Sequence, residues 1–223
     1  MQPQEEIEVH IRASYPILYV VTWEEERVSN AISDIADRVK RPRRSWSLTQ
    51  GLKPTGIDSG LENTRLPAEI QVLTHILGVK DPAIFQLKDF HAYMNDARVI
   101  RLLRDAAGKL RSKNQTIVIT APILKLPPEL EKDITVVEYP LPGESEIEEV
   151  VDVAPEAWKG KDSVDTNLPK EDRKRIVQSC LGLTLDEIES VLARSLVEKK
   201  KLDVNVILEQ KKQIVRKSGL REY

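Results

Sequence analysis

The segment ILYVVTWEEER at residues 17–27 decides the fold of this chain. An apolar, β-branched run is followed at once by charged residues that open a helix, as in the first strand–helix unit of a nucleotide-binding domain. In such a domain a glycine-rich loop fills the junction, and amides at the helix N-terminus bind phosphate. Here Glu24, Glu25 and Glu26 fill it. These carboxylates would satisfy the same amides and repel phosphate, so we predict a closed nucleotide entrance.

The bulk composition narrows the class of protein. The chain has 223 residues, a net charge of −2 and 31% charged residues, which suits one large domain or a domain with a small appendage. Cys180 is alone, which excludes a disulfide framework and a cysteine-rich zinc site. No run of about 18 apolar residues and no signal pattern occurs. We therefore expect no membrane insertion and a cytoplasmic or plastid-stromal location.

The first two-thirds of the chain alternates apolar runs with amphipathic helices. Strands are predicted at residues 17–22, 45–48, 83–87, 116–120 and 134–138, and helices at 23–40, 67–77 and from Asn95 to Leu110. Thr22 with Glu25 forms a potential capping box, and Asn95 is a potential helix cap. Residues 55–64 read as a polar loop. This alternation predicts a parallel, doubly wound α/β sheet.

After the sequence PLPG at residues 140–143 the pattern is helical throughout. Helices are predicted at residues 144–151 and 171–180, then one opened by a capping box of Thr184 and Glu187, then one capped by Asp203 and running to Lys217. A loop containing Trp158 separates the first two. We predict two domains: an α/β body at 1–140 that lacks a Walker A loop, and a helical lid with a C-terminal linker helix at 141–223.

Several segments in order resemble a known family. They are RASYP at 12–16 with LYVVTWEEER at 18–27, WSLTQGL at 46–52, FQLKDFH at 85–91, ITAP at 119–122, EYPLP at 138–142 and GLTLDE at 182–187. They are similar to the N-terminal, non-catalytic half of the conserved AAA+ ATPases of cyanobacteria and algal plastids, the conserved chloroplast reading-frame family. The resemblance implies a P-loop-NTPase-like fold with a degenerate nucleotide site, followed in the family by a catalytic AAA+ module. The chain is then a half-length relative or a fragment.

The resemblance also marks a vestigial pocket formed by Thr22, Trp23, Asp89 and Thr120 at the carboxyl ends of the strands. Asp89 stands where an NTPase holds Mg²⁺, and Thr120 stands where a sensor residue contacts the γ-phosphate. Phe90 replaces the glutamate that would polarise water and has no acid or base to offer. The alternatives are a capping carboxylate for Asp89 and a strand-end residue bonded to backbone for Thr120. The scattered histidines have no metal-ligand spacing, so no metal or cofactor is expected.

Two sets of basic residues are candidate interaction surfaces. Lys40, Arg41, Arg43 and Arg44 end the first long helix near Trp46, where they could complement the helix dipole, touch nucleic acid, dock an acidic partner or simply form a solvated face. Arg98, Arg101 and Arg104 recur three apart on a helix and form either plain polar surface or an intersubunit contact. A further basic region, near the C-terminus, comprises Lys199, Lys200, Lys201, Lys211, Lys212, Arg216 and Lys217.

These observations favour a non-catalytic AAA+-like domain that regulates or recruits a catalytic AAA+ ATPase module through protein contacts. No ATPase activity is expected of this chain alone. The first alternative is a nucleotide- or small-molecule-binding enzyme with an unorthodox site at the strand ends. The second is a nucleic-acid-binding protein that uses the basic segments, although the net charge gives no global drive toward nucleic acid. In isolation the chain is expected to be a monomer or a weak dimer, because its arginine stripe would lack bound phosphate to contact.

Overall fold

The computed structural model describes residues 2–53, 66–157, 165 and 167–219. The polar loop expected at 55–64 and the loop expected around Trp158 lie outside these residues. The chain divides into two compact units, Met1–Pro140 and Leu141–Tyr223, which are described separately below.

The first unit is built on one six-stranded sheet in the order β3-β2-β4-β5-β1-β6. Its strands are β1 (Ile17–Val21), β2 (Arg43–Ser47), β3 (Gly51–Lys53), β4 (Ala83–Lys88), β5 (Gln115–Ala121) and β6 (Thr135–Glu138). All neighbours pair in parallel except β3, which pairs antiparallel with β2. The predicted mostly parallel α/β sheet is therefore confirmed. The short edge strand β3 was not predicted, because three residues give too little alternation to read.

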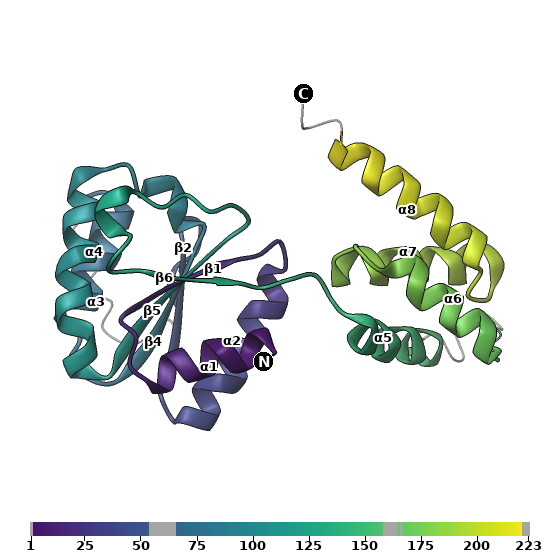
Figure 1. The fold of residues 1–223 in the computed structure, drawn as a ribbon, viewed down its shortest axis with the longest axis horizontal. Coiled ribbons are helices and arrows are strands. Elements are labelled where there is room, and N and C mark those ends of the chain that lie inside the picture. The colour runs from purple at the N-terminus through teal and green to yellow at the C-terminus, as the bar shows by residue number, and fades with distance from the viewer. Residues whose placement is uncertain (1, 54–65, 158–164, 166, 220–223) are drawn as a thin grey trace. The chain divides into compact units, whose positions relative to one another are not determined.

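Helices cover both faces of this sheet. Helices α1 (Pro3–Arg12) and α2 (Glu25–Val39) pack on Leu18 and Val20, whereas α3 (Ala68–Gly78) and α4 (Ala97–Leu110) share a core with Ile17 and Tyr19. Figure 1 shows this sheet between α3 and α4 on one side and α1 and α2 on the other. Successive residues of β1 thus point to opposite faces, and both faces are buried, which explains its continuous apolar sequence. Helix α1 was not predicted, because only Ile7 and Ile11 of its residues are buried. Three short 3-10 segments complete the unit: Phe90–Tyr93, Arg111–Lys113 and Pro128–Leu130.

Two predicted helix caps in this unit are wrong. Asp96, not Asn95, caps α4, and its carboxylate accepts a hydrogen bond from the Arg98 amide at 2.7 Å. Thr22 and Glu25 form no capping box, because α2 has Glu24 as its N-cap residue. The Thr22 amide still bonds Ala121 of the neighbouring strand at 2.8 Å, so Thr22 continues the sheet rather than starting the helix.

The second unit consists of the helices α5 (Glu144–Ala157), α6 (Lys170–Cys180), α7 (Leu185–Lys199) and α8 (Val204–Gly219) around their own apolar core. The predicted capping box is confirmed: Thr184 Oγ1 accepts from the Glu187 amide at 3.2 Å, and Glu187 accepts from the Thr184 amide at 2.9 Å. Asp203 caps α8 as predicted. Helix α5 runs past its predicted end, through Pro155. Among the described residues, none of the helices has the length and apolar character needed to cross a membrane.

Cys180 belongs to this second core. Its side chain is fully buried, and burial raises the pKa of the thiol to about 11. Because the thiolate is the reactive form of cysteine, a thiol with so high a pKa is unreactive at neutral pH.

Candidate functional site

The structure brings together the four residues predicted to line a vestigial pocket. Thr22 and Trp23 follow β1, Asp89 follows β4, and Thr120 lies near the end of β5. These three strands are neighbours in the sheet, so their carboxyl ends meet at one edge. There the four residues line a cavity of about 180 Å³ together with Glu25, Ala121 and Pro122.

The connection from β1 to α2 is very short. Only Thr22, Trp23 and Glu24 lie between the two elements. Thr22 and Glu24 are buried, and the Thr22 hydroxyl oxygen accepts a hydrogen bond from the Glu24 amide at 2.9 Å. Trp23 between them is 67% exposed, so its indole lies at the mouth of the cavity. The buried residues Thr22 and Glu24 thus fix a tight turn in which the Trp23 side chain is exposed to solvent.

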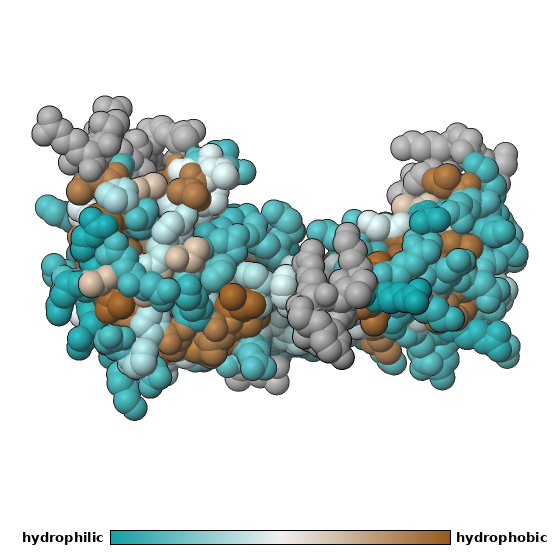
Figure 2. Space-filling model, turned by 90° about the horizontal axis from the view of Figure 1, so that it is seen from above, coloured by the Kyte–Doolittle hydropathy of each residue, from teal (hydrophilic) through white to brown (hydrophobic). Residues whose placement is uncertain are grey.

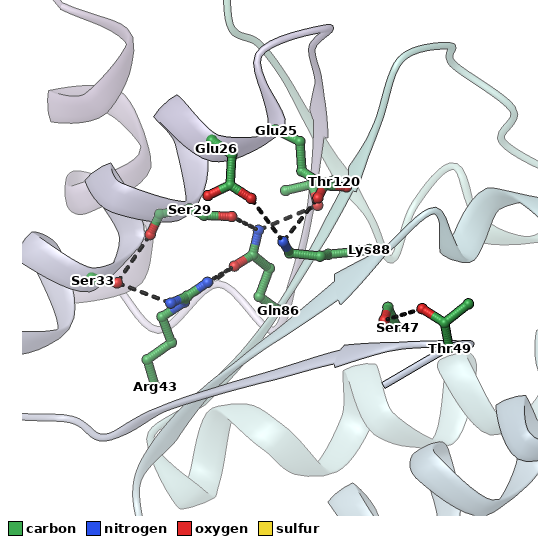
Figure 3. A network of polar contacts seen from close by, with 10 residues as sticks. All are labelled: Glu25, Glu26, Ser29, Ser33, Arg43, Ser47, Thr49, Gln86, Lys88 and Thr120. Atoms are coloured by element: carbon green, nitrogen blue, oxygen red, sulfur yellow. Dashed lines mark hydrogen bonds and ion pairs between the residues drawn. The ribbon is translucent and has the colours of Figure 1, made fainter. Parts of the chain in front are cut away.

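The carboxylates at the start of α2 bind a lysine. Lys88, the last residue of β4, places its Nζ 2.8 Å from Glu25 Oε1 and 3.7 Å from Glu26 Oε1 (Figure 3). The side chain of the N-cap residue Glu24 makes no capping hydrogen bond. The expectation that these glutamates satisfy the helix amides is therefore corrected for Glu25 and Glu26, whose described partner is Lys88. The cation beside the cavity is already neutralised by the chain's own carboxylates.

Asp89 and Phe90 differ in their exposure. Asp89 adopts a left-handed backbone conformation (φ 53°), its side chain is 64% exposed, and it makes no capping hydrogen bond, so the predicted capping role is wrong. Its amide donates to the Thr120 carbonyl at 2.9 Å, which ties β4 to β5. Phe90 is fully buried, with its ring centroid 5.5 Å from that of Trp46. The position after Asp89 is thus part of the core and does not face the cavity.

A buried polar network that was not predicted lies on the same side of the sheet as α2. Gln86, fully buried in β4, accepts hydrogen bonds from the Arg43 guanidinium and donates to Ser29 Oγ at 3.0 Å and Thr120 Oγ1 at 3.4 Å (Figure 3). Arg43 also donates to Ser33 Oγ at 2.9 Å. Burial lowers the pKa of Arg43, an effect that nearby Glu26 opposes. The sequence feature that could have revealed this network is a glutamine, Gln86, inside the otherwise apolar run AIFQL at residues 83–87.

The basic segment at the end of α2 is not a continuous surface patch. Arg41 is buried and donates to the Ile11 carbonyl at 2.9 Å, and Arg44 is buried with its guanidinium carbon 5.8 Å from the centre of the Phe85 ring. Arg43 belongs to the network above. Lys40 alone is exposed, as the left-handed C-cap of α2. The expectation that Lys40, Arg41, Arg43 and Arg44 form one exposed contact surface is therefore corrected.

The arginine stripe on α4 has carboxylate partners within the chain. Arg98 pairs with Asp96 at 2.7 Å, Arg101 pairs with Asp105, and Arg104 lies 3.6 Å from Asp133. The arginine side chains are 61%, 65% and 50% exposed, so the stripe is solvent-facing. Each guanidinium thus has its own counter-ion within the chain, so the stripe is not a row of unopposed positive charges.

Within the described part of the chain, no group of three or more histidine, cysteine, aspartate or glutamate side chains is placed to hold a metal ion. His91 lies near Asp89, with Nδ1 3.9 Å from Oδ1, but no further ligand completes a site.

Comparison with known proteins gives consistent matches. Residues 3–139 match the family described as SpoVK-like AAA ATPase, N-terminal domain, and residues 145–218 match the second domain of the same family. Two relatives are the uncharacterized AAA domain-containing proteins ycf46 of Guillardia theta, 32% identical over 96% of this chain, and of Trieres chinensis, 30% identical over 100% of it. The matches span 42% and 44% of these relatives, so the chain covers less than half of their length.

Solved structures show the same fold at low sequence identity. One, titled "Structure of C. elegans PCH-2", aligns with a TM-score of 0.59 at 13% identity and covers 95% of this chain and 67% of that one. Another, titled "Structure of E. coli MS115-1 HORMA:CdnC:Trip13 complex", aligns with a TM-score of 0.59 at 10% identity. The alignment covers 94% of this chain and 77% of that one. At these identities the likeness concerns the fold alone.

Proposed function

The chain belongs to the SpoVK-like AAA ATPase family, whose N-terminal and second domains it carries, and from that premise we propose that it is a non-catalytic AAA+-like module. It acts through protein contacts, and it regulates or recruits a catalytic AAA+ ATPase module. The observation that carries the proposal is the strand-end site, where Glu25 and Glu26 already hold Lys88.

The length of the β1–α2 connection supports this proposal. A phosphate-binding loop of the pattern G-x-x-x-x-G-K-S/T wraps the phosphates with successive backbone amides and adds a lysine. Thr22, Trp23 and Glu24 contain no glycine and leave no room for such a loop. The cavity of about 180 Å³ is also below the roughly 300 Å³ at which small-molecule sites begin.

The charges at the site point the same way. A phosphate that approached Lys88 would have to displace Glu25 and would face Glu26 and the exposed Asp89. Like charges at such short range are unfavourable, and only the partly exposed Lys88 side chain would offset them. Phe90 supplies no general base, because it is an apolar residue in the core.

Nucleotide binding is the first prediction to test. We expect no change in the melting temperature of the 223-residue chain with up to 5 mM MgATP or MgADP. A ligand present at 100 times its dissociation constant would stabilise the folded state by about 2.7 kcal/mol, which is a shift of several degrees. Lys88→Ala is the matched variant: if a shift were seen and were lost in this variant, the strand-end site would bind phosphate and the proposal would be wrong.

The regulatory part needs a second measurement. The ATPase rate of the isolated AAA module of a full-length relative should change when this chain is added in trans, and the two should co-elute on size exclusion. Trp23→Ala and Asp89→Ala, which alter the exposed side chains at the cavity, are the variants expected to weaken the effect. An unchanged rate together with no co-elution would contradict the proposal.

A further inference from the structure

The second unit carries an apolar groove that its own core does not fill. Helices α5 and α7 pack side by side, and a cavity of about 460 Å³ opens between them. The floor and walls are aliphatic: Val150, Val153, Ala154, Ala193 and Leu196. Val153 is 64% exposed, so this wall of the groove is open to solvent. On this unit, apolar residues lie exposed among hydrophilic ones (Figure 2).

Acidic side chains flank the groove. Glu149 on α5 and Glu189 on α7 both line it and are exposed. Neither has an ion-pair or hydrogen-bond partner among the described residues, whereas their neighbours Glu148 and Asp152 are paired with Arg173. An aliphatic groove between two free carboxylates fits a helix that presents an aliphatic side chain next to basic ones.

Helix α8 of the same unit has this composition on its outer face. Leu208 and Val215 are 38% and 51% exposed, and Lys212 and Arg216 are exposed and form no ion pair with another described residue. These four positions fall within about 100° around the helix, so they share one face. Lys211 lies off this face and donates to the Leu181 carbonyl at 2.6 Å. Since α8 packs on α6 and α7 of its own unit by its buried face, its outer face cannot reach its own groove.

We propose that the groove between α5 and α7 receives the outer face of α8 from a second copy of this chain. Leu208 enters the aliphatic floor, and Lys212 and Arg216 pair with Glu149 and Glu189. Each copy offers one groove and one helix, so the contact is head-to-tail and gives a ring or a short filament rather than a closed dimer. The inference concerns the second unit only and does not depend on the proposed function of the strand-end site.

The contact should be weak. One helix laid in one groove buries less than the roughly 1,200 Å² that separates transient from stable interfaces. We therefore expect self-association at about 0.1–1 mM, with monomers at low micromolar concentration. Because rim charges contribute to it, the association should weaken as NaCl is raised from 0.05 to 0.5 M.

Sedimentation equilibrium of the full chain tests the proposal. The wild type should show a weight-average mass that rises with concentration above 25.3 kDa. Glu149→Lys with Glu189→Lys should abolish the rise, and so should Lys212→Glu with Arg216→Glu. The chain that carries all four reversals should associate again, because the complementary charges are restored on opposite surfaces. The control is Lys174→Glu with Arg175→Glu, which changes the net charge by the same amount as the reversal on α8 but at exposed positions of α6. This control should leave the association intact.

Two results would overturn the proposal. One is a wild-type chain that stays monomeric at 1 mM, which would leave the groove to some other partner. The other is association that survives the single-surface reversals or that the fourfold reversal fails to restore. Far-ultraviolet circular dichroism identifies any variant that has lost its fold. If a charge-reversal variant of the groove has lost its fold, Val153→Asp replaces that variant. Val153 is an exposed residue of the groove, and its replacement by aspartate should also abolish association.

Discussion

Gln86 shows how one buried polar residue can organise several elements. Its amide, which is fully buried, links Arg43 of β2, Ser29 of α2 and Thr120 of β5. The half-buried guanidinium of Arg43 needs such a partner, because burial of an unpaired charge is costly. The burial that lowers the pKa of Arg43 expresses the same cost.

Replacing Gln86 by leucine should therefore lower the free energy of unfolding by about 1–3 kcal/mol, because Arg43 keeps its charge and retains only Ser33 as a side-chain acceptor. The double variant Gln86→Leu, Arg43→Leu should lose less than the sum of the two single variants, since no charge is then left unpaired. Urea denaturation measures all three. Thr49→Ala, at an exposed position, is the control and should stay within about 0.5 kcal/mol of the wild type. Strict additivity would show that the network is not coupled.

His75 gives the chain a pH dependence at the residue scale. Burial lowers the pKa of His75, and the nearby positive charge of Arg44 adds to this effect. In the unfolded chain the His75 imidazole has its ordinary pKa of about 6.5. Near this pH the unfolded chain therefore binds a proton at His75 more readily than the folded chain does. The contribution of neutral His75 to the free energy of unfolding should be complete above pH 6.5. It should fall as the pH drops through 6.5 toward the lowered pKa of His75 in the folded state.

The measurement is the urea midpoint at pH 7.5 and pH 5.5. His75→Gln should reduce the loss of stability between the two values, whereas His10→Gln on α1 controls for removal of a histidine elsewhere. A pH dependence that is the same in His75→Gln and in the wild type would contradict the assignment.

At the scale of elements, helix α7 is the clearest test of a local sequence signal. Its capping box satisfies two amides that the helix itself cannot bond. Thr184→Ala should lower the free energy of unfolding of the second unit by about 1 kcal/mol. Ser190→Ala, at an exposed position of the same helix, removes a hydroxyl without removing a cap. Equal effects of the two substitutions would mean that the cap contributes nothing special.

Strong periodic patterns predicted these elements well, and weak ones did not. The strand β5, with all seven residues buried, is read from its β-branched run, because such residues favour strands. Helix α1 was missed because two buried isoleucines among ten residues do not make a convincing stripe. The cap at Thr22 was wrong because the sheet still uses its amide, and a sequence does not show where pairing stops.

The position of the strand-end site could be predicted because it depends only on which strands are neighbours in the sheet. Knowing that β1, β4 and β5 are parallel neighbours suffices to bring Thr22, Asp89 and Thr120 to one edge. Side-chain direction was not predictable: the basic run at residues 40–44 looked exposed, yet Arg41, which precedes β2, and Arg44 within β2 are both buried. Long arginine side chains can be buried when they find carbonyl or aromatic partners, and such partners come from elsewhere in the sequence.

At the scale of the whole molecule, the two units have separate cores. The two clusters of the first unit use residues up to Tyr139, and the cluster of the second unit begins at Ile147. None of these buried clusters, as far as the described residues go, includes residues from both units. A unit with its own core can in principle fold alone.

We therefore predict that residues 1–140 and residues 141–223, expressed separately, each fold. The second fragment is the stringent case, because units of this size bury a smaller fraction of their surface. It should still melt cooperatively, with an unfolding enthalpy of roughly 50–60 kcal/mol for about 80 residues. Calorimetry and far-ultraviolet circular dichroism measure this, and the capping variant Thr184→Ala should lower the melting temperature of this fragment. A helical fragment that melts without a heat-absorption peak would mean that the second core is fixed only when the first unit is attached.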